Sequence, residues 1–170
     1  MSNEMTTPEC LFRNATEFGD LAALSVKDDD GEWVTDTWSD VLKDTLAVAR
    51  ALLALGFEKD DKLSIYSYNR REWYLIYAAS QMLNGVAVGV YHTCSPEEVK
   101  WVVGNSNSKF VFVGTNPQGG DDASKMPTTR IAKIIDELPE IQKAVVLDGS
   151  GLFEHANSMN WAEFIASGEG

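Results

Sequence analysis

The sequence predicts an α/β fold, in which a parallel sheet of about four strands carries helices on both faces. Short apolar runs at 62–68, 86–93, 109–114 and 144–147 have the length and composition of buried strands. The segments between them are long enough to cross back over a sheet, which is typical of right-handed parallel units. Gly, Pro or a capping pair marks most of the boundaries between these segments.

A helix and a β-hairpin are expected before the sheet. The segment 8–18 is predicted as the helix. Apolar residues alternate along 21–27 and 33–37, and the acidic turn between them includes Gly31, which can supply a positive φ. The run of three aspartates in this turn lacks the later ligands of a calcium loop, so it is interpreted as a solvated turn.

A long helix should follow the hairpin. Thr37 fits an N-cap with Asp40 three residues later, and Gly56 suits the left-handed residue after the last turn. The apolar face of this helix includes Leu42, Leu46, Ala49 and Leu53.

Two more capping pairs are predicted within the sheet region. Asn69 with Glu72 would begin one helix, and Ser95 with Glu98 would begin the next, with Pro96 at the first helical position.

The C-terminal part has weaker signals. The segment 114–128 has no apolar periodicity and is predicted to be a long, mobile surface loop. A helix over 131–138 should stop at Pro139, and a short last helix should include Trp161, Phe164 and Ile165. We expect three segments, 1–61, 62–150 and a 151–170 tail, within one structural domain.

Composition excludes some classes of function. The 170 residues are 44% hydrophobic and carry a formal net charge of -12, with a pI of about 4.5. This charge would repel nucleic acid phosphates, so no nucleic acid partner is expected. The sequence also lacks a basic membrane-surface patch, so at most peripheral membrane contact is expected.

The cysteine pattern and the N-terminus predict a cytoplasmic protein. Cys10 and Cys94 are isolated, so they form neither a disulfide framework nor a metal-ligand spacing. The first ten residues have no apolar core of the length that a signal peptide needs.

Several motifs occur in an order that resembles the front of a known enzyme family. Asn69-Arg70-Arg71-Glu72-Trp73 is followed by Gly-Val-Ala-Val-Gly-Val-Tyr-His-Thr-Cys-Ser-Pro-Glu at 85–97 and by Leu-Pro-Glu-Ile-Gln-Lys at 138–143. Over roughly 15–168, the chain resembles the AMP-forming acyl-CoA synthetases of the adenylate-forming ligase superfamily, especially the long-chain and bubblegum-type branches.

The resemblance implies a reaction and its cofactors. Such ligases convert ATP, fatty acid and CoA to acyl-CoA, AMP and diphosphate, and Mg²⁺ offsets charge as the carboxylate attacks the α-phosphate. The family's phosphate loop and catalytic lysine are expected beyond Gly170. The chain is therefore expected to be an N-terminal fragment that is inactive alone, binds no cofactor and has the remainder of the ligase as its partner.

Candidate site residues are few. No catalytic, cofactor-binding or metal-binding residue is assigned; His92, at the end of a strand, is a candidate for the wall of a fatty acid tunnel. Gly114, Gly119 and Gly120 lack the lysine of a phosphate cradle. The adjacent Arg70 and Arg71 are left to pair with acidic neighbours or to meet another part of the enzyme.

Two further expectations remain. The alternative to a ligase segment is a self-standing flavodoxin-like binding or interaction domain, which needs no ligase activity. In a ligase fragment, the helix over 70–83 and the apolar face of the last helix would lose their cover, and this favours a homodimer.

Overall fold

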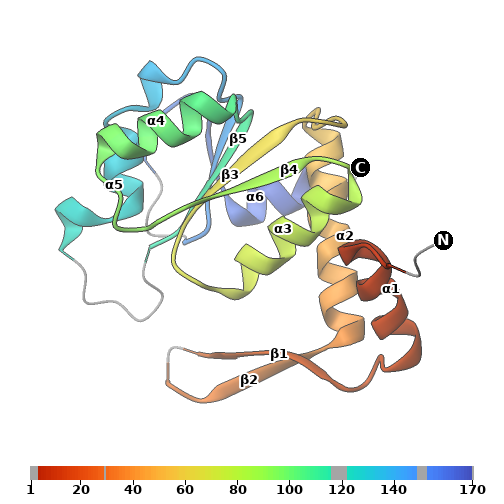
Figure 1. Cartoon of the computed structure of the whole chain (residues 1–170). Helices are drawn as coiled ribbons and strands as arrows, with labels where there is room; N and C mark the ends of the chain where they lie inside the picture. The colour runs from red at the N-terminus through yellow and green to blue at the C-terminus, as the bar shows by residue number, and fades with distance from the viewer. Residues whose placement is uncertain (1–3, 29, 116–121, 149–152, 170) are drawn as a thin grey trace.

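The computed structural model describes residues 4–28, 30–115, 122–148 and 153–169. Its centre is a five-stranded sheet in which every pair of neighbouring strands is parallel (Figure 1). In spatial order, the strands are β4 (Val86–Val90), β3 (Lys62–Tyr66), β5 (Phe110–Val113), β6 (Lys143–Val146) and β7 (Ser158–Asn160). The predicted α/β class is therefore confirmed, and the predicted count of about four strands is slightly low.

The strand that the sequence did not reveal is β7. Its three residues are all half-buried, and the single apolar residue Met159 lies between two polar ones, so they give no apolar run. The strand is placed by contacts outside itself: Ala144 N–H donates to Asn157 O at 2.9 Å, and Asn157 Nδ2 donates to Ile141 O at 2.9 Å. Tertiary pairing with β6 creates this edge strand.

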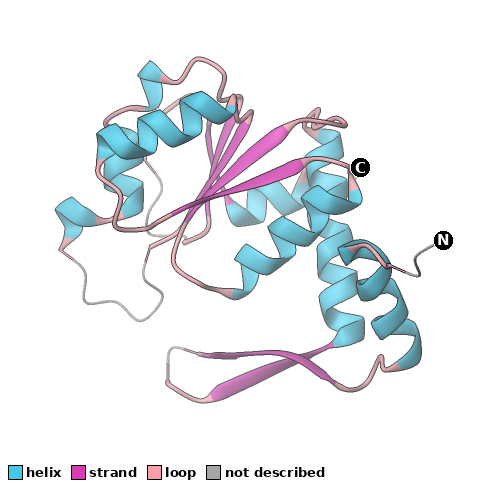
Figure 2. Cartoon of the chain, viewed as in Figure 1, coloured by secondary structure: helices cyan, strands magenta, loops and turns pink. Residues whose placement is uncertain are grey.

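Helices cover both faces of the sheet, as predicted (Figure 2). One layer contains α1 (Thr7–Glu17), α2 (Trp38–Ala54), α3 (Arg71–Met82) and α6 (Trp161–Ala166). The other layer contains α4 (Pro96–Ser106) and α5 (Pro127–Ala132), with the short 3₁₀ helices η1 (Ala123–Lys125) and η2 (Ile135–Glu137) in the same part of the chain.

Strand β5 shows how one strand serves two cores. Phe110 and Phe112 pack into the cluster with α2, α3 and α6, whereas Val111 and Val113 pack into the cluster with α4 and α5. All four are fully buried because successive side chains point to opposite faces. A strand covered on both faces reads as a continuous apolar run.

The hairpin forms a separate two-stranded antiparallel sheet. Strands β1 (Ala22–Lys27) and β2 (Trp33–Thr37) pair below α2 in the view of Figure 1, apart from the main sheet. Gly31 adopts a φ of 82° in the connecting turn, as predicted. Ser25 and Thr35 share a hydrogen bond of 2.8 Å across the strands.

Two of the three predicted capping pairs are confirmed. Thr37 with Asp40 and Ser95 with Glu98 each form both hydrogen bonds of a capping box. The Asn69 prediction is wrong, because α3 begins at Arg71 after an extended Arg70 and has no side-chain cap.

The region after β5 differs from the predicted long loop. Residues 116–121, including Gly119 and Gly120, lie outside the described residues, and the mobility of 114–128 stays a prediction. From Ala123 the chain forms η1 and then α5, so helical structure starts earlier than the predicted 131–138. That predicted helix is divided into α5 and η2.

The apolar faces of α3 and α6 that were expected to be exposed are partly buried and partly half-buried. Leu75, Ile76 and Phe164 are at most 1% exposed, and Phe164 packs edge-on against Phe112 with ring centroids 5.2 Å apart. Exposed large apolar side chains occur elsewhere; they include Leu21, Trp33, Val34, Tyr91 and Trp101. The expectation fails for these fully buried residues because α1, α2 and the sheet cover α3, and α6 lies against the same core, whereas Trp161 and Ile165 are half-buried.

The capping geometry predicts a difference between two alanine variants. Ser95→Ala should lower the free energy of unfolding by about 1 kcal/mol, because the Glu98 N–H loses the hydroxyl that it binds. Asn69→Ala should change it by less than about 0.5 kcal/mol, since the exposed Asn69 does not cap α3. Urea denaturation of both variants measures the difference, and equal losses would contradict the assigned helix starts.

Candidate functional site

The candidate site is the edge of the sheet where the parallel strands end. Strand β3 has β4 on one side and β5 on the other, so the chain changes direction across the sheet at β3. Ligands of open α/β sheets bind outside the carboxyl ends of the strands at such a switch point.

An ion network occupies this switch point. Arg70, which follows β3, donates through Nη1 to Asp148 Oδ1 at 2.6 Å and through Nε to Glu72 Oε2 at 2.8 Å. The other Asp148 oxygen accepts from the N–H and the hydroxyl of Thr115, at 2.6 and 2.9 Å. The network therefore ties together the ends of β3, β5 and β6 and the start of α3.

Gly114, which follows β5, lets the ends of β5 and β3 approach closely at the same place. A Cβ on this residue would lie 2.4 Å from Ser67 Oγ, 3.1 Å from Arg70 Nη1 and 3.2 Å from Leu147 Cδ1. No side chain fits there without displacing the network. The close packing at this position explains the need for glycine.

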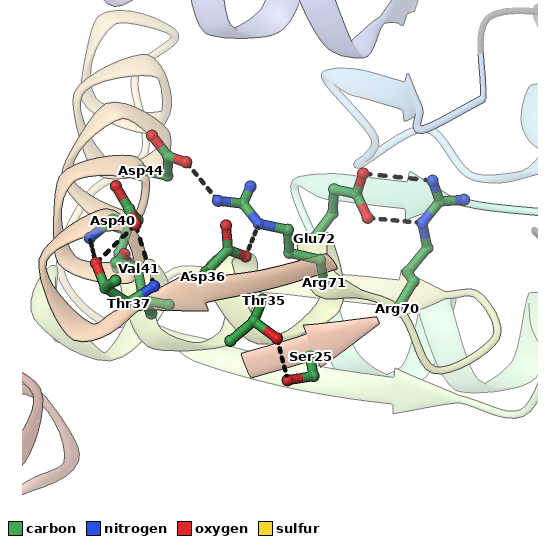
Figure 3. Close-up of polar contacts among 11 residues, drawn as sticks. Ser25, Thr35, Asp36, Thr37, Asp40, Val41, Asp44, Arg70, Arg71 and Glu72 are labelled. Carbon is green, nitrogen blue, oxygen red and sulfur yellow. Dashed lines mark hydrogen bonds and ion pairs between the residues drawn. The ribbon is translucent and has the colours of Figure 1, made fainter. Parts of the chain in front are cut away.

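Arg71 makes a second network on the other side of the helix start. Its guanidinium binds the carboxylates of Asp36 on β2 and Asp44 on α2 (Figure 3). Burial disfavours the charged form, but the hydrogen bonds to Asp36 and Asp44 outweigh it and raise the pKa of Arg71. Both arginines therefore pair with acidic neighbours, which was one of the two alternatives that the sequence left open.

A hollow of about 500 Å³ lies between the hairpin and the start of α3. It is lined by Val26, Lys27, Trp33, Asn69, Arg70, Arg71 and Glu72. Lys27 Nζ lies 5.6 Å from the centroid of the Trp33 ring. The carboxylates that bind Arg70 and Arg71 offset the positive charge of this hollow.

His92 lies at the same edge of the sheet, after β4. Its ring stacks on Tyr68, which follows β3, with centroids 3.7 Å apart and planes inclined by 24°. The two rings form a flat surface beside the switch point. Sequence reasoning identified His92 but missed Tyr68 and Arg130, whose Nη1 donates to His92 O at 3.2 Å.

Ion pairs reduce the positive charge that the described residues offer at this edge. The Arg70 cation is paired, and Asp148 and Glu72 beside it would repel phosphates. Among the residues that the structure describes, no group of three His, Cys, Asp or Glu side chains could hold a metal ion. Within the same residues, no helix is both long and apolar enough to cross a bilayer.

Comparison with solved structures defines the class of fold. Coronafacic acid ligase from Pectobacterium brasiliense superposes with a TM-score of 0.77 over 95% of this chain and 29% of that protein, at 21% sequence identity. This chain therefore has the same α/β fold as the part of that ligase on which it superposes.

Sequence comparison then shows the family. The family model described as AMP-binding enzyme matches residues 11–166, and the chain belongs to this family. It is 28% identical over 143 residues, or 81% of its length, to the long-chain-fatty-acid–CoA ligase FadD15 of Mycobacterium bovis. It is also 28% identical over 165 residues, or 96% of its length, to the long-chain-fatty-acid–CoA ligase ACSBG2 of Gallus gallus. The chain spans 22% and 20% of the lengths of these two relatives.

The Arg70 network predicts a large effect of a single substitution. Arg70→Met should lower the free energy of unfolding by about 3 kcal/mol, because Asp148 and Glu72 are left as partly buried, unpaired carboxylates. The control Lys100→Met breaks the exposed pair with Glu137 and should cost less than about 1 kcal/mol. Equal values from chemical denaturation would show that the switch-point network is no more stabilising than a surface pair.

Gly114 yields a prediction that a double variant can check. Gly114→Ala should cost about 1–3 kcal/mol, since its Cβ would overlap Ser67 Oγ. Ser67→Ala removes that oxygen, so the double variant should lose less stability than the sum of the two single variants. Gly104→Ala is the control, because its Cβ would make only an ordinary 3.5 Å contact with Leu138. Strict additivity in calorimetric melting would contradict the close contact.

Proposed function

We propose that this chain is the N-terminal segment of a long-chain fatty acid–CoA ligase. The observation that carries the proposal is the match to a long-chain-fatty-acid–CoA ligase over 96% of this chain, with the family model covering residues 11–166. The reaction would join a fatty acid to CoA and convert ATP to AMP and diphosphate. We further propose that the three segments of this chain act as one structural domain.

The proposed role of this segment is to support a site and not to perform the chemistry. Its switch point is occupied by the Arg70 network, which fixes the ends of three strands. A rigid edge of this kind can position loops against a substrate. ATP, Mg²⁺ and CoA would be held by the remainder of the ligase, which is this segment's principal partner, and we expect this segment to bind none of them alone.

His92 is the residue proposed to contact substrate. Stacked on Tyr68, it presents an aromatic surface at the carboxyl edge, which suits contact with the hydrocarbon chain of a fatty acid. The assignment is a tunnel wall, with no catalytic role.

The remaining proposals concern assembly and location. A homodimer is supported by exposed Leu21, Trp33 and Val34 in and beside the hairpin, although these are not the surfaces that the sequence suggested. A cytoplasmic location is supported by the two free thiols, Cys10 and Cys94. Any membrane contact would be peripheral, and the net charge of -12 disfavours nucleic acid.

A segment exchange tests the ligase proposal. In the Mycobacterium bovis relative, the region that matches this chain is replaced by the chain itself, and palmitoyl-CoA formation is followed with ATP and CoA. We expect turnover within about tenfold of the parent, because the same fold supports the site. The matched control is the same hybrid with Arg70→Met, which should lose thermal stability. A folded, monodisperse hybrid without turnover on any fatty acid would refute the proposal.

The isolated chain should not bind nucleotide tightly. Calorimetric titration with ATP and Mg²⁺ is expected to show dissociation constants weaker than about 1 mM, because the paired Arg70 offers no cradle for phosphates. Micromolar binding, equivalent to about -8 kcal/mol, would overturn the supporting role.

A further inference from the structure

The loop between β4 and α4, residues 91–95, is fixed by hydrogen bonds from side chains of other elements. It turns tightly, with Cys94 N–H donating to Tyr91 O at 2.9 Å, and then enters α4 through the Ser95 cap. Two carbonyl oxygens of this loop, those of His92 and Cys94, accept hydrogen bonds from side chains of other elements.

Arg130 supplies most of these hydrogen bonds. Its Nη1 donates to Cys94 O at 2.6 Å and to His92 O at 3.2 Å. The hydroxyl of the fully buried Tyr66 donates to the same Cys94 oxygen at 3.0 Å. In a chain with a net charge of -12, this guanidinium binds two uncharged main-chain oxygens. These two hydrogen bonds indicate that Arg130 fixes the loop, because hydrogen bonds from a charged donor are stronger than those from a neutral one.

The anchor itself is rigid. Arg130 belongs to α5, and three residues of this helix, Pro127, Thr128 and Ile131, are buried. Tyr66 is the last residue of β3, an interior strand that is paired on both sides. The loop is therefore fixed against two elements that pack in the core, and its position is set by them.

The consequence appears at the ring of His92. The ring stacks on Tyr68 while the carbonyl of the same residue is bound by Arg130. Fixing the main chain at His92 and at Cys94 restricts where the imidazole can lie. Without Arg130, the loop could move and the 3.7 Å stack could open.

We propose that Arg130 is a positioning residue that holds the β4–α4 loop so that His92 stacks on Tyr68 and forms the wall for the acyl chain. The second half of this inference rests on the proposed ligase function. Arg130 acts through His92 and does not itself contact the substrate.

Proton NMR of the histidine rings tests the positioning in this chain. There are only two histidines, His92 and His155, so their ring signals can be assigned by substituting each in turn. Stacking on Tyr68 should shift the His92 ring protons upfield, and Tyr68→Leu gives their position without the stack. Arg130→Met should abolish more than half of this upfield shift, and Arg130→Lys should give an intermediate value.

Lys133→Met is the matched control. It removes the same charge from an exposed residue at the end of α5, and the His92 signals should stay in place. Arg130→Lys also guards against loss of the fold, since it keeps the charge, and a cooperative melt confirms that it folds. Unchanged His92 signals in a folded Arg130 variant would overturn the positioning role.

The acyl wall is tested in the hybrid enzyme that contains this chain. Arg130→Lys should raise the KM for palmitate roughly tenfold, as when a methylene-sized apolar contact is lost, and leave kcat and the KM for ATP near their starting values. A shifted His92 signal with an unchanged KM for palmitate would show that His92 does not form a wall for the acyl chain. An unsubstituted hybrid without turnover would refute the ligase proposal and the wall with it, while the NMR result on Arg130 would still stand.

Discussion

Two adjacent arginines at the start of α3 hold the parts of this molecule in register. Arg70 binds Asp148 after β6 and Glu72 on α3, whereas Arg71 faces the hairpin and α2 and binds Asp36 and Asp44. Cations at a helix N-terminus oppose the helix dipole, so their location there requires compensation. Four carboxylates, from the hairpin, α2, α3 and the end of β6, provide it. The surplus of acidic residues thus contributes to the internal order of the fold.

These ion pairs also explain why a strong local signal failed. Asn69 and Glu72 have the spacing of a capping pair, but Glu72 is bound by Arg70, and Arg70 is extended at the helix start. A capping hydrogen bond contributes about 1 kcal/mol, and a partly buried ion network can outweigh it. At Thr37 and Ser95, the acidic partner hydrogen-bonds the cap residue itself, and the same signal gave the correct helix start.

The same constraint divides the carboxyl edge into two regions. Beside β5 and β6, the Arg70 network ties the strand ends together, and Gly114 lies close against it. Beside β4, a loop anchored by Arg130 and Tyr66 presents a pair of stacked rings. The chain belongs to the AMP-binding enzyme family, and these two regions are the basis of the supporting role that we propose for it.

The sequence by itself determined the α/β class, the apolar strands, the hairpin with Gly31 and two of the capped helices, because these depend on periodicity and on contacts within a few residues. The order of its motifs also identified the family. Only the tertiary structure decided the fifth strand, the start of α3 and the burial of α6, since each depends on residues distant in the chain. The same holds for the candidate site. His92 could be predicted from its place after a strand, but the Tyr68 ring and the Arg130 guanidinium reach it from separate elements, and no local pattern records that contact.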